Sequence, residues 1–294
     1  MMNEKILVTG VGGPAGRGTV EHLAGLGHIL IGTDMQEVES PVDSFYTVPP
    51  ALDPSYGEIL VEMIEKERVA LFIPTVTEEL PIVARLKETI EGYGCKLFIS
   101  PPDGTEIADD KLKTVRFLEE HKIPVPLSFD GGHSREEMSR KLAFPILAKP
   151  RVSRGGRGVL LHRTRETLEG ERREDILFQE FIPGKEFDLN LFIEEDGEIS
   201  ASVVLEKTAL KEGITGNALA VERVDMDDVA QLGIRVARLL KLEGPLDIDF
   251  RLRRDGTPVL LEINARLGGN ILSAREVLDQ LITTWKRSKE NAYH

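Results

Sequence analysis

The chain has 294 residues, of which 41% are hydrophobic and 30% charged, proportions typical of a soluble protein with a sizeable buried core. The net charge of −13, without any basic tract, argues against a nucleic-acid partner. No apolar stretch approaches the ~20 residues that a membrane span requires, and the first ten residues lack the apolar core of a signal peptide. Cys95 is the only cysteine, so no internal disulfide forms and we expect a reducing, cytoplasmic location.

The N-terminal region begins as a strand, a glycine-rich turn, a helix and a second strand. These elements are predicted at 5–9, 10–16, 18–26 and 29–33, and the second strand ends at Asp34. The order is typical of a Rossmann-type unit, which binds a nucleotide or anion at the helix N-terminus. Alternatively, the glycines only let the turn close tightly. The spacing G-x-G-G-x-x-G departs from G-x-G-x-x-G and is a weak indication of NAD(P) binding.

The same unit continues to two prolines at 101–102, which we expect to end the domain. Helices are predicted at 54–67 and from 78 to about 91, and strands at 70–73 and 96–100. Thr77 is a candidate helix cap, with Glu78 and Glu79 stabilised by the helix dipole. Equally, the segment 75–79 could face a ligand at the carboxyl end of a strand. Both interpretations stay open.

A second region carries a glycine-rich loop between two strands. Helices are predicted at 112–121 and 134–142, the second capped by Ser134, and strands at 144–150 and 159–161. The loop RVSRGGRG at 151–158 lets backbone N–H groups approach a polyphosphate, and Arg154 and Arg157 add positive charge. Such a loop could close as a lid, although an ordinary flexible hairpin is the alternative.

The C-terminal region is predicted to contain further strands and one packing helix. Strands are expected at 176–182, from Glu186 onward and at 199–206, a loop at 208–216, and the helix at 227–240. The segment 246–270, LDIDFRLRRDGTPVLLEINARLGGN, then forms two strands joined by a tight turn at 254–257. We expect a hairpin there.

Three oxygen-bearing side chains are set into this hairpin. Glu262 and Asn264 are two residues apart and point to one face of a strand, and Asp249 can face them from the neighbouring strand. Carboxylate and amide oxygens are ligands suited to Mg²⁺ that carries a nucleotide phosphate. The alternative is a solvated hairpin face whose charges point into water.

Five motifs, taken in order, resemble the ATP-grasp superfamily, and within it proteins similar to one half of the carbamoyl-phosphate synthase large subunit. They are TGVGGPAG at 9–16, DK at 110–111, FPILAKP with its glycine loop at 144–158, QEFIPGKE at 179–186 and EINARLGG at 262–269. The resemblance implies an α/β and α+β protein. A Rossmann-like pre-ATP-grasp domain is expected at 1–103, a lid subdomain at 104–178, and a C-terminal ATP-grasp subdomain with the metal site at 179–294.

The resemblance also implies roles for individual residues. ATP would contact Lys111 and Lys149. Its phosphates would be covered by the loop that contains Ser153, Gly155, Gly156 and Gly158. The adenine would be held by Glu180, Phe181 and Ile182, and the ribose by Glu186. Asp249, Glu262 and Asn264 would bind Mg²⁺, with Mn²⁺ as an alternative ion. Arg266 would contact the transferred phosphate or acyl phosphate, as would one of Lys207 and Lys211, a choice that the sequence leaves open.

The implied activity is that of a carboxylate–amine ligase that converts ATP to ADP and activates a carboxylate as an acyl phosphate. Small carboxylates and amines are the expected partners, together with a second copy or a partner subunit. Asn190 departs from the Asp common in these proteins, Ala265 from the Pro, and only 25 residues follow Gly269. These departures keep open a non-catalytic ATP-binding subunit that a partner completes. An NAD(P)-dependent oxidoreductase is the other alternative.

Overall fold

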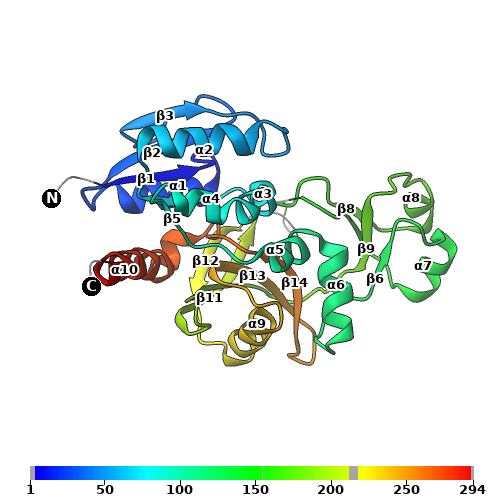
Figure 1. The fold of residues 1–294 in the computed structure, drawn as a ribbon. Helices are drawn as coiled ribbons and strands as arrows, with labels where there is room; N and C mark the ends of the chain where they lie inside the picture. The colour runs from blue at the N-terminus through cyan, green and yellow to red at the C-terminus, as the bar shows by residue number, and fades with distance from the viewer. Residues whose placement is uncertain (1–3, 154, 212–217, 293–294) are drawn as a thin grey trace.

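The computed structural model describes residues 4–153, 155–211 and 218–292, and its strands form three sheets that follow one another along the chain. Figure 1 shows the first sheet at the top of the molecule, the third sheet below it, and the second sheet to one side. Buried side chains of the first and third sheets, among them Phe72 and Phe250, belong to one hydrophobic cluster. The apolar strand residues that the sequence places in these two regions therefore hold them together.

The first sheet is parallel, with the strand order β3-β2-β1-β4-β5. Its glycine turn leaves no room for side chains, because a Cβ on Gly16 would lie 2.3 Å from the carbonyl oxygen of Gly10. The turn therefore packs tightly against the start of the helix that follows it. The strands are β1 (Lys5–Thr9), β2 (Ile29–Asp34), β3 (Ser44–Thr47), β4 (Leu71–Ile73) and β5 (Lys96–Leu97).

The helices of this region differ from the predicted ranges. The first helix begins at Pro14, four residues earlier than predicted, because proline fits the first turn of a helix. The single helix predicted from 78 to 91 is broken at Leu86, and a helix that the sequence did not predict follows Pro101. The elements are α1 (Pro14–Leu23), α2 (Tyr56–Glu67), η1 (Thr77–Glu79), α3 (Leu80–Arg85), α4 (Lys87–Gly92) and α5 (Pro102–Asp109).

The second sheet is antiparallel, with the order β6-β9-β7-β8, and has its own small core around Phe178 and Met138. Ser134 caps the following helix as predicted, since its hydroxyl accepts a hydrogen bond from the Glu137 amide at 3.1 Å. The elements are α6 (Lys111–Glu120), β6 (Ser128–Asp130), α7 (Arg135–Lys141), β7 (Ile146–Pro150), β8 (Leu160–His162), α8 (Arg165–Glu169) and β9 (Ile176–Glu180).

The third sheet is antiparallel, with the order β12-β11-β10-β13-β14. Its strand β11 runs to Leu210, so the loop predicted from Thr208 was wrong for residues 208–210, because these pair with the following strand. The remainder of that predicted loop, 212–216, lies outside the described residues. The elements are β10 (Glu186–Ile193), β11 (Ile199–Leu210), β12 (Ala218–Arg223), α9 (Asp227–Leu239), β13 (Gly244–Leu252) and β14 (Pro258–Asn264).

The residues after Gly269 form η2 (Ile271–Ser273) and the long helix α10 (Arg275–Ala292). The sequence presents this end as polar, but its apolar positions, including Trp285 and Leu278, pack into a cluster with strands of the first sheet. Figure 1 shows α10 beside the lower edge of the first sheet. None of the helices in the described part of the chain combines the length and the apolar character of a membrane span.

Candidate active site

The hairpin of β13 and β14 brings the predicted magnesium ligands opposite one another. Asp249 pairs with Glu262, and Asp247 pairs with Asn264 two residues away. The turn at 253–257 closes as expected, with the Arg253 amide donating to the Thr257 carbonyl at 2.9 Å. Because directly opposed residues of an antiparallel pair share a face, Asp249, Glu262 and Asn264 lie on one side of this hairpin.

The neighbouring strand β10 adds two residues that the sequence analysis missed or left without a role. Asp188 pairs with Asp249, and Asn190 pairs with Asp247. Asp188, Asp247 and Asp249 each offer a carboxylate oxygen within 4.8 Å of the others. The alternation in LDID and in EFDLN was the signal that could have found Asp188 and Asp247, because residues two apart on a strand share a face.

Lysine ammonium groups contact the carboxylates of this face. Lys207 of β11 donates to Glu186 at 3.0 Å and also binds Asp249. Lys111, at the start of α6, lies 3.2 Å from Glu262. Lys211, the other candidate, lies past the end of β11 and is exposed. The structure thus brings Lys207 into the cluster and leaves Lys211 outside it.

Burial and charge shift the pKa values of these groups in different directions. Burial raises the pKa of Asp249 to about 7, although the Lys207 charge opposes the shift. Burial also opposes ionisation of Glu262, but the charges of Lys111 and Lys149 outweigh it and lower the pKa of Glu262. Burial lowers the pKa of Lys149 to about 8. At neutral pH the face therefore keeps Glu262 ionised, while Asp249 is near the midpoint of its titration.

Asp247 is the most strongly perturbed acid of the face. Its side chain is buried, and burial together with the neighbouring charge of Asp188 raises its pKa well above the ordinary value. Its Oδ2 is 3.4 Å from Arg266, while its Oδ1 has no hydrogen-bond donor among the described residues. Two buried carboxyl groups side by side resist being ionised together.

The segment 180–186, which is expected to hold adenine and ribose, is bonded to the strand β13 that carries Asp249. The Glu180 carboxylate is bound by Arg253 and by the Leu127 amide, so its side chain is engaged within the protein. The Phe181 ring lies under the Arg251 guanidinium, 5.1 Å away. Arg251 also donates to the Ile182 carbonyl at 2.9 Å and to Glu186 at 2.7 Å. The segment from 180 to 186 is thereby fixed to β13.

The glycine-rich loop joins β7 to β8, and its glycines adopt a backbone that favours glycine. Gly155, Gly156 and Gly158 have φ values of +58°, +74° and +73°. Lys111 donates to the carbonyl of Ser153 at 2.7 Å, which links the loop to the residue that contacts Glu262. Arg154 lies outside the described residues.

Arg266 connects the hairpin to the first sheet. Its guanidinium donates to Asn264 at 3.1 Å and to the Thr77 hydroxyl at 3.0 Å. Thr77 was a candidate helix cap, one of the two interpretations of this segment. It does not act as a cap, because Val76 occupies the N-cap position. Glu79 turns into the core of the first sheet and bonds to the Thr9 hydroxyl. Within the segment 75–79, Thr77 contacts the candidate site, whereas Glu79 stabilises the first sheet.

Comparisons with known proteins agree with this geometry. A family model described as an ATP-grasp domain matches residues 108–270. The large chain of carbamoyl phosphate synthase from Archaeoglobus fulgidus is 24% identical over 236 residues, which cover 73% of this chain and 21% of that one. Carbamoyl-phosphate synthase from Methanobrevibacter smithii is 23% identical over 240 residues, which cover 77% of this chain and 64% of the relative. The chain thus spans about a fifth of the first relative's length and under two thirds of the second's.

Solved structures share the fold. An L-amino acid ligase from Bacillus licheniformis superposes with a TM-score of 0.69 at 20% identity, over 92% of this chain and 69% of that one. An N5-carboxyaminoimidazole ribonucleotide synthetase from Thermotoga maritima gives a TM-score of 0.63 at 21% identity, over 90% and 69% of the two chains. The family match covers more than half of the chain and includes the glycine loop, the 180–186 segment and the hairpin. The chain therefore belongs to the ATP-grasp family.

Proposed function

We propose that the chain is an ATP- and Mg²⁺-dependent ligase, which activates a carboxylate as an acyl phosphate for attack by an amine. The observation that carries the proposal is the pairing of Asp249 with Glu262 on a half-buried face where each carboxylate already contacts an ammonium group. The carboxylate oxygens of this face are hard ligands, and they stabilise a positive charge that lies beside them. The relatives named carbamoyl phosphate synthase and the ligase structures support the same reaction class.

A magnesium ion fits the donor set of the hairpin. Asp249 and Glu262 offer carboxylate oxygens and Asn264 an amide oxygen, and hard oxygen ligands of this kind suit Mg²⁺. The ion would neutralise negative charge on the phosphates of ATP. A neighbouring protein of known structure, a 2-oxoglutarate carboxylase domain, is described in complex with MgADP, which supports the choice of metal and nucleotide.

The nucleotide would lie between the second and third sheets. The 180–186 segment would bind adenine and ribose through its backbone and Glu186. Lys111 and Lys149, together with the loop of Ser153, Gly155, Gly156 and Gly158, would face the phosphates. The linkage of Lys111 to both Ser153 and Glu262 supports this placement, because it joins the loop to the metal ligands. The three separate sheets support a division into three parts, and the parallel first sheet supports a Rossmann-like first domain. The expected bound between 178 and 179 lies inside β9, and the bound between 103 and 104 lies inside α5.

Chemistry on this face requires positioning and charge neutralisation more than a dedicated base. A substrate carboxylate oxygen attacks the γ-phosphorus, the bond to the bridging oxygen breaks, and ADP leaves. The amine then attacks the acyl carbon, phosphate departs with the C–O electron pair, and the amine loses a proton. Arg266 and Lys207, which reach Asn264 and Asp249, would stabilise the charge that develops on the transferred phosphoryl group.

An ADP-release screen tests the proposal. The purified chain is incubated with ATP, Mg²⁺ and a panel of amino acids and small carboxylates, with hydroxylamine added as a small nucleophile that traps acyl phosphates. We expect ADP release that depends on one class of carboxylate. Tight ATP binding without ADP release across the panel would instead support a non-catalytic subunit, and binding of NAD(P) without ATP would support an oxidoreductase.

Two lysine variants sharpen the same test. Lys207→Met is expected to reduce kcat by about a hundredfold or more, because Lys207 lies among the ligands and stabilises phosphoryl charge. Lys211→Met is the matched control and should stay within about threefold of the wild type, since an exposed lysine beyond the strand contributes little. Equal losses in both variants would contradict the assignment of Lys207.

A further inference from the structure

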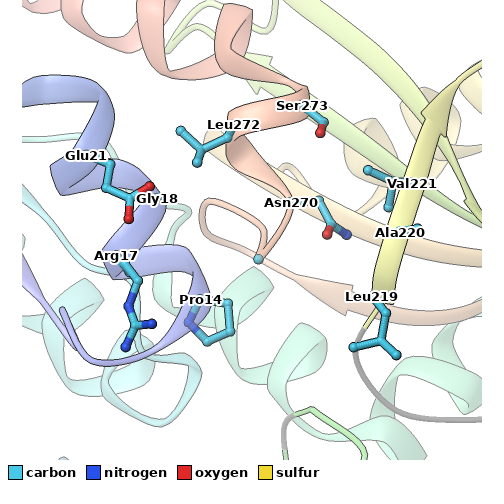
Figure 2. Close-up of a pocket in the computed structure, with 11 residues that line it drawn as sticks. Pro14, Arg17, Gly18, Glu21, Leu219, Ala220, Val221, Asn270, Leu272 and Ser273 are labelled. Carbon is cyan, nitrogen blue, oxygen red and sulfur yellow. The ribbon is translucent and has the colours of Figure 1, made fainter. Parts of the chain in front are cut away.

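A pocket of about 380 Å³ lies where the first helix meets the third sheet, next to the proposed catalytic face. Figure 2 shows α1 with Arg17 and Glu21 on one side, β12 with Leu219 and Val221 on the other, and Asn270 between them. The pocket is thus built from three segments that are far apart in the sequence. Its lining contains none of the residues assigned above to ATP or Mg²⁺.

The pocket lining combines one charge of each sign with exposed apolar side chains. Within the part of the lining that the structure describes, Arg17 and Glu21 are the charged residues, and they lie one helical turn apart on α1. Leu219 and Leu272 are 69% and 50% exposed, and both line the pocket. A ligand that carries both charges and some apolar surface matches this lining.

The inner end of the pocket leads to the carboxylates of the catalytic face. Asn270 lines the pocket and donates through Nδ2 to Asp188 Oδ2 at 2.9 Å. Asp188 is 1% exposed, and its carboxyl group also interacts with the side chains of Asn190 and Asp247. Asn190 beside it is 0% exposed. A buried polar group therefore lies at this end of the pocket.

We propose that this pocket binds the nucleophilic co-substrate, and that this co-substrate is an amine with its own carboxylate, such as an α-amino acid. The inference rests on the proposed ligase function and names its second substrate. The carboxylate would pair with Arg17 at the outer rim, since a guanidinium binds carboxylates through two parallel hydrogen bonds. The amino group would point inward, past Asn270, toward Asp188 and the acyl phosphate. Leu219 and Leu272 would contact the side chain.

The charges that line the pocket determine which end of the amino acid would point outward and which inward. Among the described residues, Arg17 is the only cation in the pocket lining, so it is the group there that would bind a ligand carboxylate. The inner end carries Asp188 and, beyond it, Asp247 and Asp249, so a positive or hydrogen-bond-donating group is favoured at that end. An amine without a carboxylate would leave Arg17 unused, and a simple carboxylate would meet repulsion at the inner end.

The test compares Arg17→Ala with Arg235→Ala, which removes the same charge from an exposed position of α9 outside the pocket. ADP release is measured with the best of twenty α-amino acids as nucleophile, and separately with hydroxylamine. Arg17→Ala should raise KM for the amino acid by about tenfold, because the lost ion pair is worth about 1.4 kcal/mol. Its kcat, its KM for ATP and its hydroxylamine rate should match those of Arg235→Ala.

A binding measurement accompanies the kinetics. The same amino acid should raise the Tm of the wild type and of Arg235→Ala, and should fail to raise that of Arg17→Ala at equal concentration. The inference is overturned if Arg17→Ala behaves like its control, or if ethylamine serves as well as the α-amino acids. ADP release with hydroxylamine but with no amino acid would overturn the inference alone. No ADP release with any carboxylate, even with hydroxylamine, would overturn the proposed function as well.

Discussion

Two buried acids, Glu79 of η1 beside the first sheet and Asp247 of the third sheet, differ in how their carboxyl groups are hydrogen-bonded. Glu79 accepts hydrogen bonds from the Thr9 hydroxyl at 2.5 Å, from the Val76 amide at 3.0 Å and from the Tyr56 hydroxyl. Asp247 contacts the Arg266 guanidinium at 3.4 Å through one oxygen, and it also interacts with the neighbouring carboxyl group of Asp188. Both side chains are buried, and burial raises the pKa of both.

The difference lies in the donors rather than in the burial. Neutral hydroxyl and amide groups satisfy both oxygens of Glu79, so this acid links β1, α2 and η1 and leaves nothing to bind a ligand. The acids of the third sheet lie against one another and face ammonium and guanidinium groups. A buried acid therefore indicates a binding face when it lies beside further acids and cations, and indicates a structural role when neutral donors satisfy both of its oxygens.

The largest expected effect is on ATP turnover, after a substitution in the third sheet. Glu262→Ala should reduce ATP turnover by about a thousandfold or more, because it removes a proposed metal ligand and leaves the charges of Lys111 and Lys149 unbalanced. Circular dichroism should show an unchanged fold. Glu198→Ala removes an exposed carboxylate in the turn between β10 and β11 and serves as the control. Substrate-dependent ADP release at the wild-type rate by Glu262→Ala would end the assignment of this site.

The next effect is on stability, in the first sheet. Glu79→Ala should lower the free energy of unfolding by about 3 kcal/mol, since it leaves the Thr9 and Tyr56 hydroxyls buried without their partner and opens a cavity. Chemical denaturation measures the change. KM for ATP should stay near the wild-type value at a temperature where the variant is folded. A stable variant with impaired ATP binding would reverse the roles that we give to the two sheets.

Much of the hairpin could be predicted from the sequence. The alternation of Asp249 with apolar neighbours and the two-residue spacing of Glu262 and Asn264 set the face of each strand, and the Asp255–Gly256 turn set their register. These features all lie within residues 249–264, so they could be predicted without knowledge of distant parts of the chain. The glycines at 155, 156 and 158 were predictable for the same reason, because their positive φ values restrict the choice of residue.

The parts that the sequence did not predict depend on distant pairing. Asp188 reaches the site because β10 pairs with β13, about sixty positions further along the chain, and no local pattern specifies that neighbour. Lys207 rather than Lys211 joins the face because β11 pairs with β10 at Glu186. The end of β11 was placed too early since Ala209 and Leu210 gain their partners only from β12. Strand ends are set by such partners more than by propensity.

The smallest expected effect tests Asp247, the acid that lies against Asp188. Replacing Asp247 by Asn should stabilise the protein at pH 8, raising Tm by about 2 °C, because the amide carries no charge next to Asp188. The folded-state pKa of Asp247 is raised above the unfolded value, so the folded state retains a proton that the unfolded state has lost. Stability of the wild type therefore falls as the pH rises above the unfolded pKa, whereas the variant lacks this dependence.

The advantage of Asp247→Asn should accordingly grow between pH 5 and pH 8, as measured by thermal unfolding at several pH values. Glu62→Gln, an exposed neutralisation in α2, is the control and should show no such growth. A variant that is less stable than the wild type at pH 8 would mean that the Asp247 carboxylate is ionised and well compensated by Arg266. In that case Asp247 would resemble Glu79, and the distinction between a structural and a ligand-binding acid would have to rest on Asp188 alone.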